Sequence, residues 1–243
     1  MIFFILVGVA GMIMGGVASV AGFGIGSVLT PLVATQYGMK LAVALVAIPH
    51  FAATLLRAWR LRRDVDRTVL LRFGIASAAG GLTGAILHNR VKSNGLAIVL
   101  GCLLVFAGIT GVAGLSQRLR FGRRTAWVAG ILSGGLGGLV GNQGGIRSAA
   151  LMGFDVRKEA FVATATAIGV VVDLARLPIY LTAQGREILA AWPLVAVATG
   201  ATLTGTLAGE SILRRIPERT FRMAVSLIIL GLGIAVLGGV AHS

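Results

Sequence analysis

Long apolar runs separated by short connections dominate this chain of 243 residues and leave it few ways to fold. Most runs hold about 20 residues, which at about 1.5 Å per residue lets a helix cross a hydrocarbon core of about 30 Å. Because 56% of the residues are hydrophobic and 12% are charged, the composition excludes a soluble domain. The sequence predicts an all-α polytopic membrane protein.

Ten apolar segments are predicted. They cover residues 2–20, 27–37, 41–59, 69–87 and 95–115, and then residues 126–140, 146–154, 160–181, 188–208 and 221–240. The segments at 27–37 and 146–154 are too short to span a bilayer, so we expect glycine-broken half-helices or re-entrant hairpins there. If these two segments are loops instead, eight membrane helices remain, so the expected number is about 8 to 10.

Two glycine-rich stretches match each other under a shift of 119 residues, which places Gly130 on Gly11. The same shift places Gly134, Gly135, Gly141, Gly145 and Arg176 on Gly15, Gly16, Gly22, Gly26 and Arg57. We therefore expect two repeats, residues 1–115 and 126–243, joined by a linker at 116–125. Since each repeat holds five segments, an odd number, the second must enter the membrane with the opposite orientation.

The net charge of +14 comes from cations in short connections, which is typical of membrane orientation and does not indicate nucleic-acid binding. With the N-terminus outside, residues 57–72, 118–124, 157–158 and 214–222 place 16 Lys and Arg inside, against Lys40, Arg90, Lys92 and Arg186 outside. The bias predicts both termini outside and a cytoplasmic linker, in a bacterial inner (plasma) membrane. The lipid bilayer is then the main partner.

Polar residues interrupt the apolar sequence at residues 138–151, GLVGNQGGIRSAAL. Irregular backbone at membrane depth is tolerated where it lies within protein or lines a cavity, and the start of a helix offers free N–H groups to an anion. Arg147 adds a planar fork of donors that suits an oxyanion. We expect Arg147 to bind a small anionic substrate; the alternatives are an internal salt bridge or a side chain that reaches the inner face.

Other residues near the two glycine-rich stretches are candidates for the same site. Glycine lets backbone amides approach a ligand, and short polar side chains line cavities, although helix packing and threonine bonding to its own helix are the alternatives. The candidates are Gly24, Gly26, Ser27, Thr30, Asn142, Gln143, Gly144, Gly145 and Thr166, with Thr164 beside them.

Two titratable residues are candidates for proton or ion coupling. Asp173 stands three residues before Arg176, so it either carries a proton or serves as the ion partner of Arg176. Arg57 and Arg176 are alternatively expected to reach the interface, with Pro178 ending or kinking the second helix. His50 follows Pro49, where we expect a kink, and either binds ligand or proton or bonds a carbonyl freed by the proline.

No motif indicates catalysis, a metal or a cofactor. The single cysteine, Cys102, lies in an apolar run, and His50, His88 and His242 are far apart in the sequence. Neither a CxxC or HExxH pattern nor a phosphate-binding loop occurs. We expect a protein that is not an enzyme.

The runs GGVASVAGFGIGSVLTPLV and GGLGGLVGNQGGIRSAALM resemble the TauE/SafE family, also called TSUP, of sulfite exporters and organosulfonate permeases. The resemblance implies a transporter of small sulfur-containing or organic anions. We expect a secondary transporter, exporter or permease, that works by alternating access at a midplane site between the repeats. An anion channel or a non-transporting membrane scaffold is the alternative, and no motif specifies the substrate, the direction, the coupling ion or a homo-oligomer.

Overall fold

The structure is a computed structural model that describes residues 1–22, 24–114, 123–142, 144, 147, 151, 158–213 and 218–241. Within these residues the regular elements are helices: α1 (Ile2–Ala21), α2 (Ile25–Arg60), the 3-10 helix η1 (Arg62–Asp64), α3 (Arg67–Arg90), α4 (Ser93–Val112), α5 (Arg123–Val140), α7 (Lys158–Ala190), α8 (Trp192–Leu213) and α9 (Glu218–Ala241). Six of the described helices are long and apolar enough to cross a membrane. The predicted all-helical membrane architecture is confirmed.

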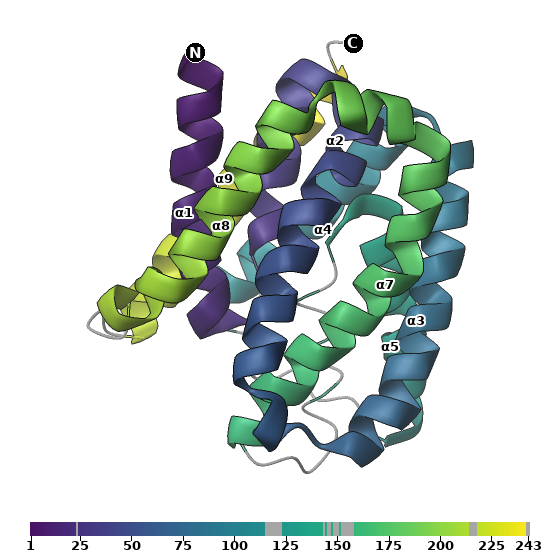
Figure 1. The fold of residues 1–243 in the computed structure, drawn as a ribbon, viewed down its shortest axis with the longest axis vertical. Helices are drawn as coiled ribbons and strands as arrows, with labels where there is room; N and C mark the ends of the chain where they lie inside the picture. Colours follow the sequence, from purple (N-terminus) through teal and green to yellow (C-terminus); the bar gives the residue numbers. More distant parts are fainter. Residues whose placement is uncertain are drawn as a thin grey trace.

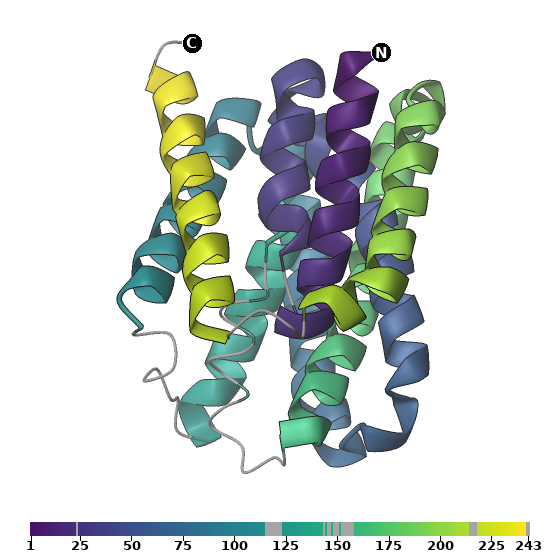
Figure 2. The same cartoon turned by 90° about the vertical axis from the view of Figure 1, so that its left-hand side faces the viewer.

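The first helix and the start of α2 form a hairpin. Gly22, with φ of 80°, ends α1, and α2 begins after Gly24. The hairpin brings the ring of Tyr37 to 6.4 Å from that of Phe3, so residues 25–37 return to the end where the chain began. Gly38 then leaves helical geometry, with φ of 72° and ψ of 157°, and residues 39–60 cross to the opposite end (Figure 2). This break separates the segments predicted at 27–37 and 41–59.

The second half begins at the end opposite the termini, where α5 and α7 both start (Figure 2). Gly141, with φ of 74°, follows the end of α5. The helix α7 continues past Pro178 and leaves helical geometry only at Gln184, with φ of −135°. The expectation that Pro178 ends this helix was therefore wrong, because the preceding turn keeps helical angles. Most of the short segment predicted at 146–154 lies outside the described residues.

The helices α2 and α7 occupy the centre of the bundle (Figure 1). Their most apolar stretches are 56% and 61% buried, against 11% for α9. Around this central pair, α1 packs on α8, α3 on α5, and α4 on α9. The outer helices expose large apolar side chains such as Ile5, Leu6, Ile228 and Ile234. A protein that buries its polar residues and exposes apolar ones on its periphery suits a lipid environment.

Close backbone contact holds two of the outer pairs together. A Cβ on Gly15 of α1 would overlap the carbonyl oxygen of Thr202 in α8, and a Cβ on Gly134 of α5 would overlap that of Ser77 in α3. Small residues permit such approach, which is the main source of helix association in lipid. Both glycines therefore serve helix packing, which was the alternative to ligand binding predicted for glycines of the two glycine-rich stretches.

The two chain ends lie at the same end of the bundle (Figure 1). The opposite end holds η1 and the basic connection around it, with Arg62 and Arg63 exposed. The helices α2, α3 and α7 connect these two ends (Figures 1 and 2). Their central turns therefore lie far from both ends of the bundle.

Candidate buried charge site

Two polar stripes face each other where α2 and α7 pack at the centre of the bundle. Each stripe has residues spaced by four and then three positions, so each occupies one face of its helix. The stripe on α2 is His50, Thr54 and Arg57, and that on α7 is Asp173 and Arg176, with Gly169 one turn before them on the same face. His50 contacts Asp173, and a Cβ on Gly169 would lie 3.1 Å from Cγ2 of Thr54, so the two stripes run antiparallel in contact.

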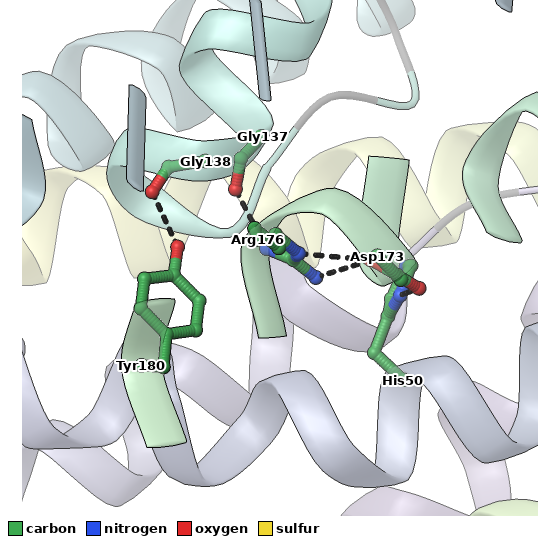
Figure 3. Close-up of polar contacts among 6 residues, drawn as sticks. All are labelled: His50, Gly137, Gly138, Asp173, Arg176 and Tyr180. Atoms are coloured by element: carbon green, nitrogen blue, oxygen red, sulfur yellow. Dashed lines mark hydrogen bonds and ion pairs between the residues drawn. The ribbon is translucent and has the colours of Figure 1, made fainter. Parts of the chain in front are cut away.

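Asp173 lies at the middle of this contact and is fully buried. Its Oδ1 accepts from Nε of Arg176 at 2.8 Å and lies 2.7 Å from Nη2, while its Oδ2 lies 2.7 Å from Nδ1 of His50 (Figure 3). A buried carboxylate needs this compensation because desolvation of an unpaired charge is costly. The pairing of Asp173 with Arg176 that their spacing predicted is present, and the ring nitrogen Nδ1 of His50 is engaged by a carboxylate and not by a backbone carbonyl.

Both stripe arginines bind the end of a neighbouring helix. Nη1 of Arg176 donates to the carbonyl of Gly137 at 2.6 Å, and Nη1 of Arg57 donates to the carbonyl of Ala18. These carbonyls lie in the last turns of α5 and α1, where helix ends carry partial negative charge. Because Arg57 and Arg176 are only 6% and 1% exposed, the expectation that they reach the membrane interface was wrong.

Arg147 lies against the same cluster and is 2% exposed. A Cβ on Gly169 would lie 3.0 Å from its Nη1, and its charge interacts with those of Arg57, Asp173 and Arg176. Within the described part of the chain, Nε and Nη1 of Arg147 have no hydrogen-bond partner. The alternative in which this side chain reaches the inner face was therefore wrong, and the carboxylate of Asp173 is already shared between Arg176 and His50.

The two glycine breaks meet beside this cluster. A Cβ on Gly26, at the start of α2, would overlap the carbonyl oxygen of Gly141, at the end of α5. The space beside Gly141 also holds Nη1 of Arg176 and Oγ1 of Thr30, each 3.7 Å from where its Cβ would be. Thr30 is fully buried, and its Oγ1 lacks a partner among the described residues. The structure thus brings together the starts and ends of helices that the sequence placed more than 100 residues apart.

The remaining predicted residues differ in their surroundings. Gly24, Ser27 and Gly144 are buried and Asn142 is partly buried, whereas Gln143 and Gly145 lie outside the described residues. The hydroxyl of Thr166 donates to the carbonyl of Val162 in its own helix, which was the predicted alternative for threonine. Thr164 accepts from the backbone N–H of Asp66, just before α3 begins, so it belongs to the end of the bundle and not to the centre.

Sequence reasoning missed four residues of this region. It took Arg57 for a loop cation or an interfacial side chain, named His88 only in excluding a metal site, and did not consider Thr54 or Tyr180. Tyr180 donates to the carbonyl of Gly138 (Figure 3), and its ring lies 5.1 Å from that of His88, whose Nδ1 is 2.8 Å from the carbonyl of Leu139. The spacing of His50, Thr54 and Arg57 was a usable signal, because three polar residues on one face of an apolar helix indicate a buried polar contact.

A family model described as sulfite exporter TauE/SafE matches residues 7–236 of the 243. The chain belongs to the TauE/SafE family. The resemblance carried by the two glycine-rich runs is confirmed, and the match extends over nearly the whole chain. No curated protein and no solved structure matches the chain. TauE/SafE proteins are membrane exporters, and the apolar helices agree that this chain is an integral membrane protein.

The buried centre of this TauE/SafE protein is positively charged. Among the described residues it holds three guanidinium groups, Arg57, Arg147 and Arg176, against the single carboxylate of Asp173. No group of three or more metal-binding side chains occurs in the same described part. Buried guanidinium groups suit oxyanions chemically, since their charge is poorly screened there. The described residues of this centre therefore carry more positive than negative charge.

Proposed function

We propose that this protein is a secondary transporter, exporter or permease, for a small sulfur-containing or organic anion such as sulfite or a sulfonate. The observation that carries the proposal is the burial of Arg147, 2% exposed, with two nitrogen atoms, Nε and Nη1, that no described residue satisfies. A buried guanidinium is costly unless a partner compensates it. A substrate anion supplies that partner, and the family's name gives the class of anion.

We further propose that the two halves of the chain are inverted repeats. A shift of 119 residues converts the bond from Arg57 to Ala18 into the bond from Arg176 to Gly137. It also converts the contact of His50 with Asp173 into the contact of Gly169 with Thr54. The pairing of α1 with α8 becomes that of α5 with α3. Contacts that recur in this way support a two-fold relation between residues 1–115 and 126–243, with residues 116–125 as linker.

Alternating access follows from such symmetry, because the two repeats can exchange conformations around a fixed central site. A cavity of about 390 Å³ is lined by residues such as Tyr37, Lys40 and Gln184. The ring of Tyr37 lies 6.4 Å from that of Phe3, so the cavity is near the N-terminus.

A column of polar side chains leads from Lys40 to Asp173. Nε2 of His88 lies 3.1 Å from the carbonyl of Lys40, and the ring of His88 lies beside that of Tyr180. Tyr180 in turn lies beside the guanidinium of Arg176, which donates to Asp173. We propose that this column marks the side from which the site opens to the end of the bundle near the N-terminus.

Proton coupling at His50 and Asp173 forms a further part of the proposal. Their contact of 2.7 Å joins α2 to α7, so a proton held there changes the attraction between the two repeats. In vesicles, we expect His50→Gln to abolish accumulation of sulfite driven by a pH gradient while exchange of sulfite for sulfite continues. Gradient-driven uptake at the wild-type rate in this variant would remove His50 from coupling.

Flux of sulfite through purified protein in vesicles tests the proposed function. We expect Arg147→Ala to lose at least about tenfold in flux, because the variant removes a charged donor worth about 2 kcal/mol or more to a buried anion. Arg72→Ala is the matched control, since Arg72 is exposed near the start of α3. Saturable exchange distinguishes a carrier from a channel. Wild-type flux in Arg147→Ala would refute the proposed site, and absence of any anion flux in wild type would refute the function.

A further inference from the structure

The two polar stripes differ at one pair of equivalent positions. Under the shift of 119 residues, Arg57 corresponds to Arg176, and each arginine uses Nη1 to bind the last turn of a helix. Nε of Arg176 also donates to Asp173 at 2.8 Å, but Nε of Arg57 is buried without a partner among the described residues. The residue that corresponds to Asp173 is Thr54. The first stripe therefore lacks the carboxylate that the second one has.

A nitrogen-bearing side chain flanks this position in both stripes, although a different residue supplies it. His50 lies beside the carboxylate of Asp173, at 2.7 Å. The residue that corresponds to His50 is Gly169, which has no side chain. The guanidinium of Arg147 approaches Gly169 instead, because a Cβ there would lie 3.0 Å from Nη1 of Arg147 and 3.1 Å from Cγ2 of Thr54. Arg147 thus takes the place of the imidazole beside Thr54.

The result is a set of buried polar atoms beside Thr54, where the other stripe has a carboxylate. Thr54 is fully buried, and its Oγ1, like Nε of Arg57 and Nε and Nη1 of Arg147, has no hydrogen-bond partner in the part of the chain that the structure describes. The charges of Arg57 and Arg147 repel each other. Buried polar groups are nearly always bonded, so four such atoms on neighbouring side chains favour a polar ligand there.

We propose that the oxyanion group of the substrate binds beside Thr54, between Arg57 and Arg147, at the position equivalent to the carboxylate of Asp173. This inference rests on the proposed transport function and deepens it by naming Arg57 and Thr54 as substrate-binding residues. The site requires a single oxyanion head group of the size of a carboxylate, sulfite or sulfonate. The carboxylate of Asp173 shows how the protein holds such a group, with Nε of one guanidinium and an imidazole nitrogen from the facing helix.

Placing a carboxylate in the chain at this position tests the proposal. We expect Thr54→Asp to pair internally with Arg57 and Arg147, and so to melt at a higher temperature than wild type in buffer free of oxyanions. The same variant loses stabilisation by added sulfite, with an apparent Kd at least about 30-fold weaker than in wild type. Thr54→Asn, which matches Thr54→Asp in size but is uncharged, is expected to melt below Thr54→Asp in the same buffer, and Arg72→Gln, at an exposed position, is the control that keeps the response of wild type to sulfite.

The outcomes separate this inference from the proposed function. Sulfite, acetate and neutral dimethyl sulfone are added in turn, and only the two anions are expected to stabilise wild type and Arg72→Gln. A Thr54→Asp protein that responds to sulfite as wild type does overturns the inference and leaves the function standing, as does one that melts below Thr54→Asn in anion-free buffer. If wild type responds to no anion and moves none in vesicles, the function itself fails.

A second variant covers the case in which Thr54→Asp does not fold. Arg57→Gln removes the Nε donor while keeping a side chain that can bond the carbonyl of Ala18. Its apparent Kd for sulfite is expected to rise at least about 30-fold, whereas Arg72→Gln leaves the Kd unchanged. An unchanged Kd for sulfite in folded Arg57→Gln overturns the inference.

Discussion

At the scale of single residues, the centre of this protein is held by charges that lipid cannot solvate. Arg57, Asp173 and Arg176 are each less than 7% exposed, and each contacts a helix other than its own. Because an unpaired ion in this environment is costly, the pairs fix how α2 and α7 sit against each other and against the ends of α1 and α5. The same groups that hold the fold together therefore define the proposed anion site.

The pair formed by Asp173 and Arg176 gives a prediction about stability. We expect Asp173→Asn to reduce the free energy of unfolding by about 3 kcal/mol, because it leaves the Arg176 guanidinium buried without its carboxylate. The double variant, Asp173→Asn with Arg176→Gln, should lose much less free energy of unfolding than the two single variants lose together, since the unpaired charge is gone. Unfolding in detergent, followed for all four proteins of the cycle, measures the coupling. Additive effects would show that the ion pair contributes nothing.

At the scale of helices, the breaks are made by glycines in conformations that other residues avoid. Gly38 has φ of 72° and ψ of 157°, which places it in a region almost confined to glycine. The break lets residues 25–37 return to one end of the bundle while residues 39–60 cross it. Without it, the start of α2 would not meet the end of α5 beside the charges.

Substitution of Gly38 tests this requirement. No atom lies within 4 Å of a Cβ added at Gly38 or at Gly185, so space is the same at both positions. Gly38→Ala is nevertheless expected to lower stability by about 1 to 3 kcal/mol, because alanine is strained at this φ. Gly185→Ala, where φ is not positive, should change it by less than about 1 kcal/mol. Equal melting temperatures for the two variants would contradict the role given to the break.

The outer helix pairs depend on glycine for a different reason, close contact of backbones. Gly134→Ala places a methyl group against the backbone of Ser77, and we expect a loss of about 1 to 3 kcal/mol from overpacking. Gly200→Ala is the matched control, since Gly200 is exposed and has no atom within 4 Å of an added Cβ. Melting of both proteins in detergent compares them. Destabilisation by Gly200→Ala as large as by Gly134→Ala would show that close contact with Ser77 is not the cause of the loss.

Hydropathy alone predicted the helices well, because each element that crosses lipid must be apolar over its whole length. The helices α1, α3, α4 and α9 begin and end within about three residues of the predicted segments. The contacts of the site were harder to predict. Arg57 stands at the end of an apolar run, so a charge count assigns it to a loop, and only the fold brings it to the carbonyl of Ala18. Contact between distant stripes is a property of packing, which hydropathy does not encode.

At the scale of the whole molecule, the two ends of the bundle are chemically different. The end opposite the termini holds the basic connection of η1, with Arg62 and Arg63, whereas the end with the termini holds Lys40 and Lys92 and the cavity beside Gln184. Basic connections are retained on the cytoplasmic side of a membrane. We therefore propose that both termini lie outside and that the cavity beside Lys40 opens outward, as the excess of cations in the sequence indicates.

Cysteine labelling in intact cells tests this orientation. Cys102, the single cysteine, is exposed and is first replaced by serine. In this background Arg63→Cys and Lys92→Cys place one thiol at each end of the bundle, both at exposed positions. A maleimide that does not cross membranes is expected to label Lys92→Cys in intact cells and Arg63→Cys only after the membrane is opened. The reverse pattern would show that both termini lie in the cytoplasm, and would make the cavity beside Lys40 the cytoplasmic entrance for an exported anion. Labelling of both thiols in intact cells would mean that the chain inserts in two orientations, in which case the cation bias does not determine the topology.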